Sequence, residues 1–250
     1  MSISIDKIIT KTTNPEDVDF QVGQVLLIDK PLDWTSFDVV NKLRFKLKHG
    51  LGVKKIKVGH AGTLDPLASG LLLICTGKLT KDIDSLQAMD KVYSGTIVLG
   101  GSTATYDSEV PPDQYYPTEH IDKELLKSAR LSFIGSIDQI PPIYSAIKID
   151  GQKAYNLARR GSDIEMKSRA IRINSFDIDD INFPILGFEV SCSKGTYIRS
   201  LAHDFGKACQ SGAYLGSLRR ERIGDYDVRD GFTMDEALSF IENALKKDFK

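Results

Sequence analysis

Cysteine is scarce in this chain, and long apolar runs are missing. The three cysteines, Cys75, Cys192 and Cys209, are odd in number and lack C-x-x-C spacing, so we expect neither a disulfide framework nor a zinc knuckle. The longest aliphatic run, Leu71 to Ile74 followed by Cys75, is far shorter than the ~20 residues of a membrane span. No secretory signal precedes it. We therefore expect a cytoplasmic protein without a membrane partner.

Net charge is almost absent as well, but the charges are segregated. Lys+Arg number 33 and Asp+Glu 34 in 250 residues, with 41% hydrophobic residues, which is ordinary for a globular protein. Two stretches are rich in positive charge. Residues 148–172 hold seven cations and three acids. Residues 39–64 have no acid and seven cations: Lys42, Arg44, Lys46, Lys48, Lys54, Lys55 and Lys57. Such segregation suits phosphate binding; a merely solvated helix face is the alternative.

Signatures of cofactor and metal binding are also missing. The sequence contains no G-x-G-x-x-G, H-E-x-x-H or G-x-S-x-G. Gly70 to Lys78 is spaced wrongly for a phosphate-binding loop, with Leu79 where serine or threonine is required. The four histidines are scattered without ligand spacing. We therefore expect no metal and no organic cofactor.

The hydrophobic patterns predict an α+β fold with a mixed, mainly antiparallel sheet flanked by helices. Residues 1–20 are polar and predict a loose N-terminal arm, which leaves one domain over 21–250. Phe37, Val40, Leu43 and Leu47 have helical spacing. Strands are predicted at 23–31, 71–75, 91–101, 143–149, 169–178, 185–193 and 214–222. Helices are predicted at 36–48, 121–133, 153–160, 196–210 and 234–247.

One polar loop stands out, GHAGTLDPLASG at residues 59–70. It links two apolar strands and carries Asp65 directly before Pro66, which biases Asp65 towards an extended conformation. Glycines at 59, 62 and 70 allow another backbone or a flat ligand to approach closely. An Asx-type turn at Asp65 is the structural alternative, and the local string leaves both open.

Six sequence blocks together resemble the TruB family of pseudouridine synthases. GHAGTLDPLASGLL resembles the catalytic loop, LLIDKPLDWTSFDVV the first motif, and KVYSGTIVLG the tyrosine-bearing strand. CSKGTYIRSLAHDFG and YLGSLRRERIGDY resemble the last two motifs, and QIPPIYSAIKIDGQKAYNLARRG the tRNA-gripping insertion. The blocks follow the family order over about residues 24–228. The resemblance implies a pseudouridine synthase fold with a thumb-like insertion at about 139–166.

The resemblance also implies roles for seven residues. Asp65 corresponds to the catalytic carboxylate, which attacks the sugar C1′, adds to C6 or deprotonates C2′; the sequence leaves these routes open. Arg199 corresponds to the arginine that pairs with it, and Tyr93 to the tyrosine that stacks on the target base and handles the C5 proton. The other four correspond to a wedge in the RNA loop (His60), the walls of the uracil pocket (Tyr197 and Leu218) and a support of the catalytic loop (Lys30). For Lys30, direct RNA binding and a purely structural role both stay open.

The implied reaction is the isomerisation of uridine to pseudouridine at position 55 in the TΨC arm of tRNA. It needs no cofactor, and the implied protein is a monomer that requires no protein partner. The two basic stretches and Arg219-Arg220-Glu221-Arg222 are candidates for phosphate contacts. Only 28 residues follow Arg222, so we expect no C-terminal PUA domain. An RNA-guided rRNA pseudouridine synthase and a non-catalytic RNA-binding or RNA-folding module are the alternatives.

Overall fold

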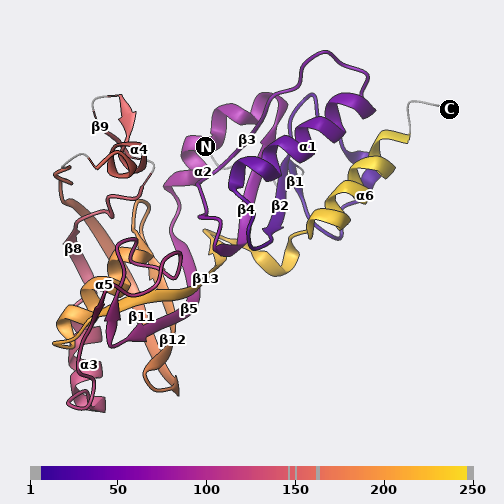
Figure 1. Cartoon of the computed structure of the whole chain (residues 1–250). Helices are drawn as coiled ribbons and strands as arrows, with labels where there is room; N and C mark the ends of the chain where they lie inside the picture. Colours follow the sequence, from indigo (N-terminus) through magenta and orange to yellow (C-terminus); the bar gives the residue numbers. More distant parts are fainter. Residues whose placement is uncertain (1–6, 146, 150, 162–163, 247–250) are drawn as a thin grey trace. The chain divides into compact units, whose positions relative to one another are not determined.

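The computed structural model describes residues 7–145, 147–149, 151–161 and 164–246 (Figure 1). The chain divides into two compact units. Unit 1 comprises residues 1–91 and 219–250, and unit 2 comprises residues 92–218. The borders fall inside two strands, β5 (Lys91–Leu99) and β13 (Ala213–Ile223). Each unit is described separately below.

Unit 1 is a small sheet with both faces covered. The strand order is β1-β2-β4-β13, with β3 paired to β4 and β14 to β13. β2 alternates between two cores, since Leu26 and Ile28 pack on one side and Val25 and Leu27 on the other. The strands of this unit, besides β13, are β1 (Ile8–Ile9), β2 (Val25–Lys30), β3 (Val58–His60), β4 (Ala68–Thr76) and β14 (Tyr226–Asp227).

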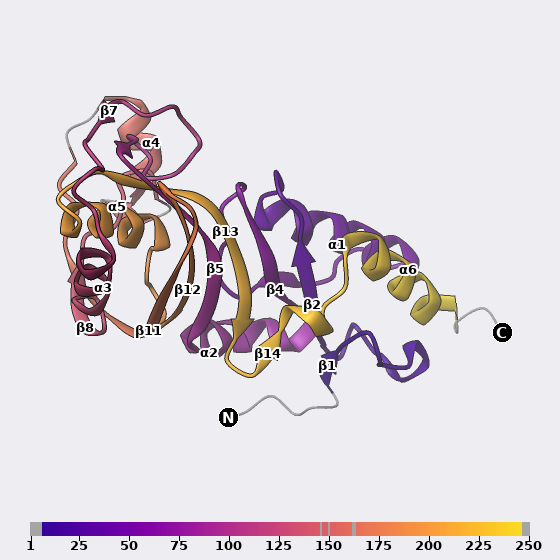
Figure 2. The ribbon, with the colours of Figure 1, turned by 90° about the horizontal axis from the view of Figure 1, so that it is seen from below.

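Helices cover the two faces of this sheet (Figure 2). α1 (Ser36–Gly50) and α6 (Met234–Leu245) lie on one side of β2 and β4, and α2 (Ile83–Ala88) on the other. Thr35 and Asp38 form a capping box at the start of α1, and Thr233 and Glu236 form one at the start of α6. These reciprocal hydrogen bonds explain why both helices begin where the sequence predicts.

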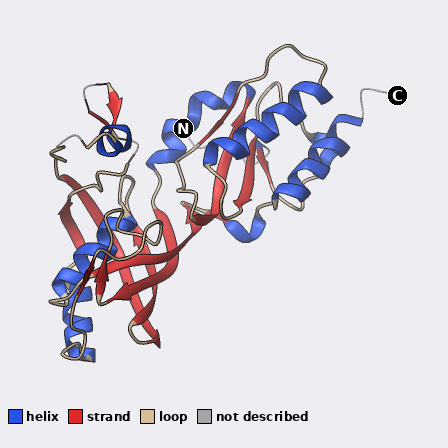
Figure 3. Ribbon diagram, in the orientation of Figure 1, coloured by secondary structure: helices blue, strands red, loops and turns tan. Residues whose placement is uncertain are grey.

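Unit 2 is a sheet with two helices on one face. The strand order is β13-β5-β12-β11-β8, and β11 pairs antiparallel with both β12 and β8. Phe133, Phe176 and Phe205 form an aromatic cluster between sheet and helices. Figure 3 shows both helices along the same side of the strands. These elements, besides β5 and β13, are β8 (Gly135–Gln139), β11 (Arg169–Asn182), β12 (Ile185–Cys192), α3 (Lys123–Leu131) and α5 (Ile198–Ala208).

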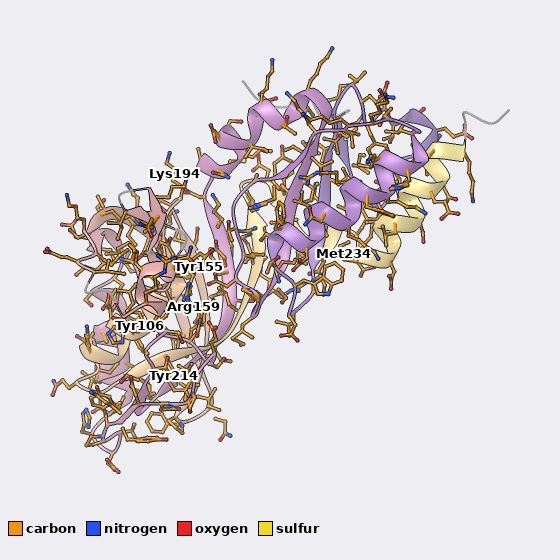
Figure 4. All side chains as sticks on the ribbon, turned by 45° about the horizontal axis from the view of Figure 1, so that its top comes forward. Tyr106, Tyr155, Arg159, Lys194, Tyr214 and Met234 are labelled. Atoms are coloured by element: carbon orange, nitrogen blue, oxygen red, sulfur yellow. The ribbon has the colours of Figure 1, made fainter. Side chains whose placement is uncertain are left out.

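The predicted thumb-like insertion contains a short hairpin and a short helix. β9 (Lys148–Ile149) pairs antiparallel with β10 (Gln152–Lys153), and α4 (Ala154–Arg159) follows directly. On α4, the Arg159 guanidinium carbon lies 5.8 Å from the centroid of the Tyr155 ring (Figure 4). Asp150 lies outside the described residues.

The α+β prediction with a mainly antiparallel sheet is confirmed, and three local predictions need correction. The loose arm is wrong for residues 7–20, because β1 pairs parallel with β2 and the side chains of Ile9 and Phe20 are buried; residues 1–6 lie outside the described residues. The strand expected at 143–149 is reduced to β9. No strand or helix is predicted between the strand at 91–101 and the helix at 121–133, but this segment contributes to a two-stranded pair, β6 (Gly101–Ser102) and β7 (Gln114–Tyr115).

Phe37 is also misplaced by the sequence pattern. It is 57% exposed, although it has helical spacing with Val40. The buried stripe of α1 instead runs through Val39, Val40, Leu43 and Leu47, which leaves Phe37 on the solvent side. Among the described residues, no helix is long and apolar enough to cross a membrane.

Candidate active site

Asp65 lies in unit 1, in the connection between β3 and β4, and is half-buried. The Ser36 hydroxyl accepts a hydrogen bond from Leu64 N (2.8 Å) and donates one to Leu64 O (3.1 Å). On the other side, Ala68 N donates to Asp65 O at 3.0 Å. The backbone is therefore fixed on both sides of the carboxylate, by groups that do not use its side-chain oxygens.

Lys30, at the end of β2, also supports the Asp65 loop. Its side chain is fully buried, and Nζ donates to the carbonyl oxygens of Pro31 (2.8 Å), Trp34 (2.7 Å) and Pro66 (3.5 Å). Burial lowers the pKa of Lys30 from 10.5 to about 8, and the nearby Asp65 carboxylate acts in the opposite direction. Lys30 thus shapes the loop and interacts electrostatically with Asp65.

Arg220, which the sequence analysis did not assign to the site, is a second buried support. It is 1% exposed, and it donates from Nε to Leu71 O (2.7 Å) and from Nη2 to Gly62 O (3.1 Å). Gly70 has a φ of +104°, and a Cβ there would collide with the backbone O and N of Arg220. Only glycine therefore lets β4 and β13 approach this closely.

The expectation that the arginine run of β13 contacts phosphates is corrected for two of its members. Arg220 is buried, and Arg219 forms a bidentate pair with Asp29 at 3.0 and 2.8 Å. Arg222 alone of the three is exposed. Alternation along the strand places Arg219 and Arg220 on opposite faces of the sheet.

His60 ends β3 close to the same loop. Burial lowers the pKa of His60 below 6.5, the positive charge of Arg220 lowers it further, and a backbone hydrogen bond at Gly62 opposes both. The ring is therefore neutral near pH 7. Its Nδ1 has no hydrogen-bond partner among the described residues. Unit 1 thus gathers three of the seven predicted residues: Lys30, His60 and Asp65.

Arg199 lies in unit 2, in the first turn of α5, and is 6% exposed. Its guanidinium donates to Thr105 O (3.2 Å) and Tyr144 O (3.0 Å). A carboxylate oxygen of Asp107 lies 3.5 Å from Arg199 Nη1. The guanidinium plane is therefore oriented by groups from two separate loops.

Asp107 is a site residue that the sequence analysis missed. Its Oδ1 accepts from Thr105 Oγ1 (2.6 Å) and Glu109 N (3.0 Å), and its backbone oxygen accepts from Thr103 Oγ1 (2.7 Å). These bonds leave Oδ2 facing Arg199. The T-A-T-Y-D string at 103–107 is the available signal, since threonines flanking an aspartate favour such local hydrogen bonds.

Tyr106 links the same loop to α5 by stacking on His203. The two rings are 3.8 Å apart between centroids and 10° from parallel, and Tyr106 has a φ of +63° (Figure 4). Burial lowers the pKa of His203 to about 4, with a further contribution from Lys207. His203 lies one turn after Arg199, so the loop contacts α5 at two successive turns.

Tyr197 precedes α5 and is held through its backbone. Tyr197 N donates to Gln139 Oε1 (2.8 Å), and Gln139 Nε2 donates to Tyr197 O (3.1 Å). The Arg169 guanidinium carbon lies 4.5 Å from the centroid of the Tyr197 ring. The remaining predicted residues of unit 2 are Tyr93 on β5, which is 9% exposed, and Leu218 on β13, which is half-buried.

Among the described residues, no group of three or more His, Cys, Asp or Glu side chains has the geometry of a metal site. All three cysteines are buried, and burial raises the pKa of both Cys75 and Cys209 to about 12. Cys75 and Cys209 therefore stay protonated at neutral pH, without the thiolate that metal binding or nucleophilic attack requires.

Comparison with known proteins identifies relatives along almost the whole chain. A protein of Flavobacterium johnsoniae named tRNA pseudouridine synthase B is 57% identical over 83% of this chain and 91% of the relative. One of Phocaeicola vulgatus with the same name is 51% identical over 90% of this chain and 96% of the relative. Among solved structures, a Cbf5-Nop10-Gar1 complex contains a chain that is 25% identical, with a TM-score of 0.65. That alignment covers 92% of this chain and 62% of the other.

A family model gives the same result. The model of the TruB family pseudouridylate synthase N-terminal domain matches residues 48–198, which include the Asp65 loop and end one residue before Arg199. The match and the relatives agree with the six sequence blocks and with the fold. The chain belongs to the TruB family of pseudouridine synthases.

Proposed function

We propose that this chain isomerises uridine to pseudouridine in tRNA, at position 55 of the TΨC arm, with Asp65 as the reacting carboxylate. The names of its relatives support tRNA as the substrate. The observation that carries the proposal is the fixed loop around Asp65. Ser36, Lys30 and backbone groups hold the loop in place, so the backbone on both sides of the carboxylate is fixed.

The reaction rearranges one nucleotide without an external reactant. The C1′–N1 bond breaks, the uracil rotates, a C1′–C5 bond forms, and the C5 proton leaves while N1 gains one. A carboxylate oxygen of Asp65 begins the sequence by attacking C1′, adding to C6 or removing the C2′ proton. A rigid loop suits each of these routes, because the reacting atoms must approach within about 3–3.5 Å.

In this proposal, Arg199 pairs with Asp65, and Asp107 orients Arg199. Arg199 is buried, and its guanidinium donates to the backbone oxygens of Thr105 and Tyr144. These contacts hold the guanidinium in one orientation, which favours a bidentate interaction with a carboxylate. Tyr93 stacks on the target uracil and handles the C5 proton. Stacking of this kind contributes about 1–3 kcal/mol per base.

The other predicted residues bind the everted nucleotide. Tyr197 and Leu218 enclose the uracil, and Lys30 supports the loop. His60 wedges into the RNA loop as the nucleotide flips out, and its neutral ring suits insertion among bases because no charge must be desolvated. The insertion at 139–166 grips the TΨC stem–loop. The protein acts in the cytoplasm as a monomer with one catalytic domain that also includes residues 7–20, without a protein partner or cofactor.

The test uses a tRNA transcript carrying tritium at C5 of uracil, incubated with protein and without guide RNA. We expect label release by the wild type and a loss of at least about a thousandfold in Asp65→Asn. The matched control is Asp235→Asn, an exposed aspartate on α6, which should retain the wild-type rate. Both variants should unfold within about 1 kcal/mol of the wild type.

Three outcomes would overturn the proposal. Asp65→Asn could release label at the wild-type rate, which would remove the carboxylate from the chemistry. The wild type could bind tRNA and release nothing, which would favour a non-catalytic RNA-binding module. Release that begins only after a guide RNA and its protein partners are added would instead favour an RNA-guided enzyme.

A further inference from the structure

The outer face of α1 carries two aromatic rings that nothing in the described chain covers. Phe37 is 57% exposed and Phe45 is 64% exposed. Two helical turns separate them, about 12 Å along the axis. Exposing phenylalanine rings to water is unfavourable in free energy. Together with the flanking cations, the two rings indicate a binding surface rather than a solvated helix face.

Each ring is held by a cationic or imidazole neighbour on the same helix. The Arg44 guanidinium carbon lies 5.8 Å from the centroid of the Phe37 ring, and the His49 ring centroid lies 4.0 Å from that of Phe45. Arg44 is itself fixed, since it donates to Asn41 Oδ1 (3.1 Å) and Val58 O (2.9 Å). The rings therefore form a pre-ordered platform.

Cations surround this platform from Lys42 to the end of the connection before β3. Within the described structure, none of the exposed lysines in this region forms a salt bridge: Lys42, Lys48, Lys54, Lys55 and Lys57. Lys46 is excluded, because it pairs with Glu242 of α6 at 2.8 Å. The unpaired lysines create a positive field on one side of unit 1.

The acids near this face gather at the helix start. Asp38 belongs to the capping box of α1, where its carboxylate accepts from Thr35 N and Oγ1. Asp33 and Asp38 line a shallow hollow together with Trp34, Asn41 and Lys42. A phosphate chain is thus repelled from the first turn of α1 and attracted to its last turns and the residues that follow.

We propose that this outer face of α1, with residues 51–57, binds a single-stranded segment of the RNA substrate outside the arm that carries the target uridine. Bases stack on Phe37 and Phe45, and Lys48, Lys54, Lys55 and Lys57 contact the phosphates. An RNA strand fits better than an acidic protein, because each exposed ring can take a separate base and the lysines can contact the phosphates between them. The inference rests on the proposed function, which supplies the RNA.

The experiment compares two substrates, a full-length tRNA transcript and the isolated TΨC stem–loop. The test variants are Phe37→Ala with Phe45→Ala, and Lys48→Gln with Lys55→Gln. The matched controls lie in unit 2: Tyr115→Ala removes another exposed aromatic ring (79% exposed), and Lys123→Gln with Lys127→Gln removes two exposed lysines of α3. Each protein is assayed by tritium release and by tRNA binding over a range of salt concentrations.

For full-length tRNA, we expect the phenylalanine variant to lose at least about fivefold in affinity. The lysine variant should weaken binding and make the slope of log affinity against log salt shallower by about 1.4. On the stem–loop, kcat/KM of both variants should match the wild type, because that RNA lacks the contacted segment. Hydroxyl-radical footprints should lose protection at the same segment in both variants and in neither control.

The inference fails if both variants bind and modify full-length tRNA like the wild type, or if they impair the stem–loop equally. Unaltered RNA binding would point instead to an acidic protein partner for this face. These outcomes differ from failure of the proposed function, in which the wild type itself releases no label from either RNA.

Discussion

Arg220 in unit 1 and Arg199 in unit 2 are both buried, yet their surroundings differ. Arg220 donates to two backbone carbonyls, those of Leu71 and Gly62, and no carboxylate pairs with it among the described residues. Arg199 also donates to two carbonyls, but the carboxylate of Asp107 lies 3.5 Å away. Arg220 therefore holds backbone segments in place, whereas Arg199 is also oriented by a neighbouring negative charge.

The difference separates two ways of building a site. Carbonyl partners fix a loop and leave the positive charge of Arg220 in place, where it also lowers the pKa of Lys30 and His60. A carboxylate partner orients a cation through a side chain that can be changed while the backbone bonds remain. We therefore expect changes around Arg220 to act mainly on stability, and changes around Arg199 to act mainly on catalysis.

The largest expected effect is steric and lies in unit 1. Gly70 and Gly135 both have a φ of +104°, but a Cβ at Gly70 meets the Arg220 backbone while one at Gly135 meets nothing within 4 Å. Gly135→Ala should cost about 1–2 kcal/mol of unfolding free energy from backbone strain. Gly70→Ala should cost at least about 4 kcal/mol, as measured by urea denaturation.

Because the two glycines share the same φ, their difference isolates the close approach of β13 to β4. Equal losses in the two variants would mean that β13 can shift away from Gly70 at little cost. The close packing around Arg220 would then not determine the shape of the Asp65 loop.

A smaller effect is expected at Asp107 in unit 2. In Asp107→Asn the amide oxygen can still accept from Thr105 and Glu109, while the amide NH₂ faces Arg199 in place of a carboxylate oxygen. We expect kcat/KM for tRNA to fall about 10–100-fold and the unfolding free energy to fall by about 2 kcal/mol. Wild-type activity in this variant would contradict the proposed orientation of Arg199.

The smallest expected effect concerns pH. The pKa of His203 is lowered from 6.5 to about 4 in the fold, so the unfolded chain takes up the proton first. Stability from the neutral ring is present above pH 6.5 and is lost as pH falls towards 4. Between pH 7 and 4.5, we expect the wild type to lose about 1 kcal/mol more than His203→Gln. Identical pH profiles from urea denaturation would contradict this prediction.

Much of the fold follows from local sequence patterns. The capping residues of α1 and α6 and the apolar strands β2 and β4 depend on residues close together in the chain, so the sequence predicts their positions well. Motif resemblance identified the family, and the comparisons confirm it. The roles of the seven site residues stay predictions, supported by their positions within each unit.

The missed features depend on contacts between distant parts of the sequence. Arg220 meets Leu71 across 149 residues, and Arg199 meets Thr105 across 94. The hydrophobic periodicity of a short segment does not predict which arginine will be buried and will donate to backbone carbonyls. Phe37 was misplaced for the opposite reason: its spacing fits a helix, but spacing alone does not tell which edge of the apolar stripe is covered.

The two hydrogen bonds of the Ser36 hydroxyl have a consequence for the spacing of RNA contacts on unit 1. One hydroxyl satisfies both backbone groups of Leu64, so the first turn of α1 and the loop beside Asp65 move as a single piece. An RNA that engages the outer face of α1 and the Asp65 loop together must span a set length. In the proposed complex, a substrate whose contacts with α1 and with the Asp65 loop are too near or too far apart would occupy one of the two places, but not both.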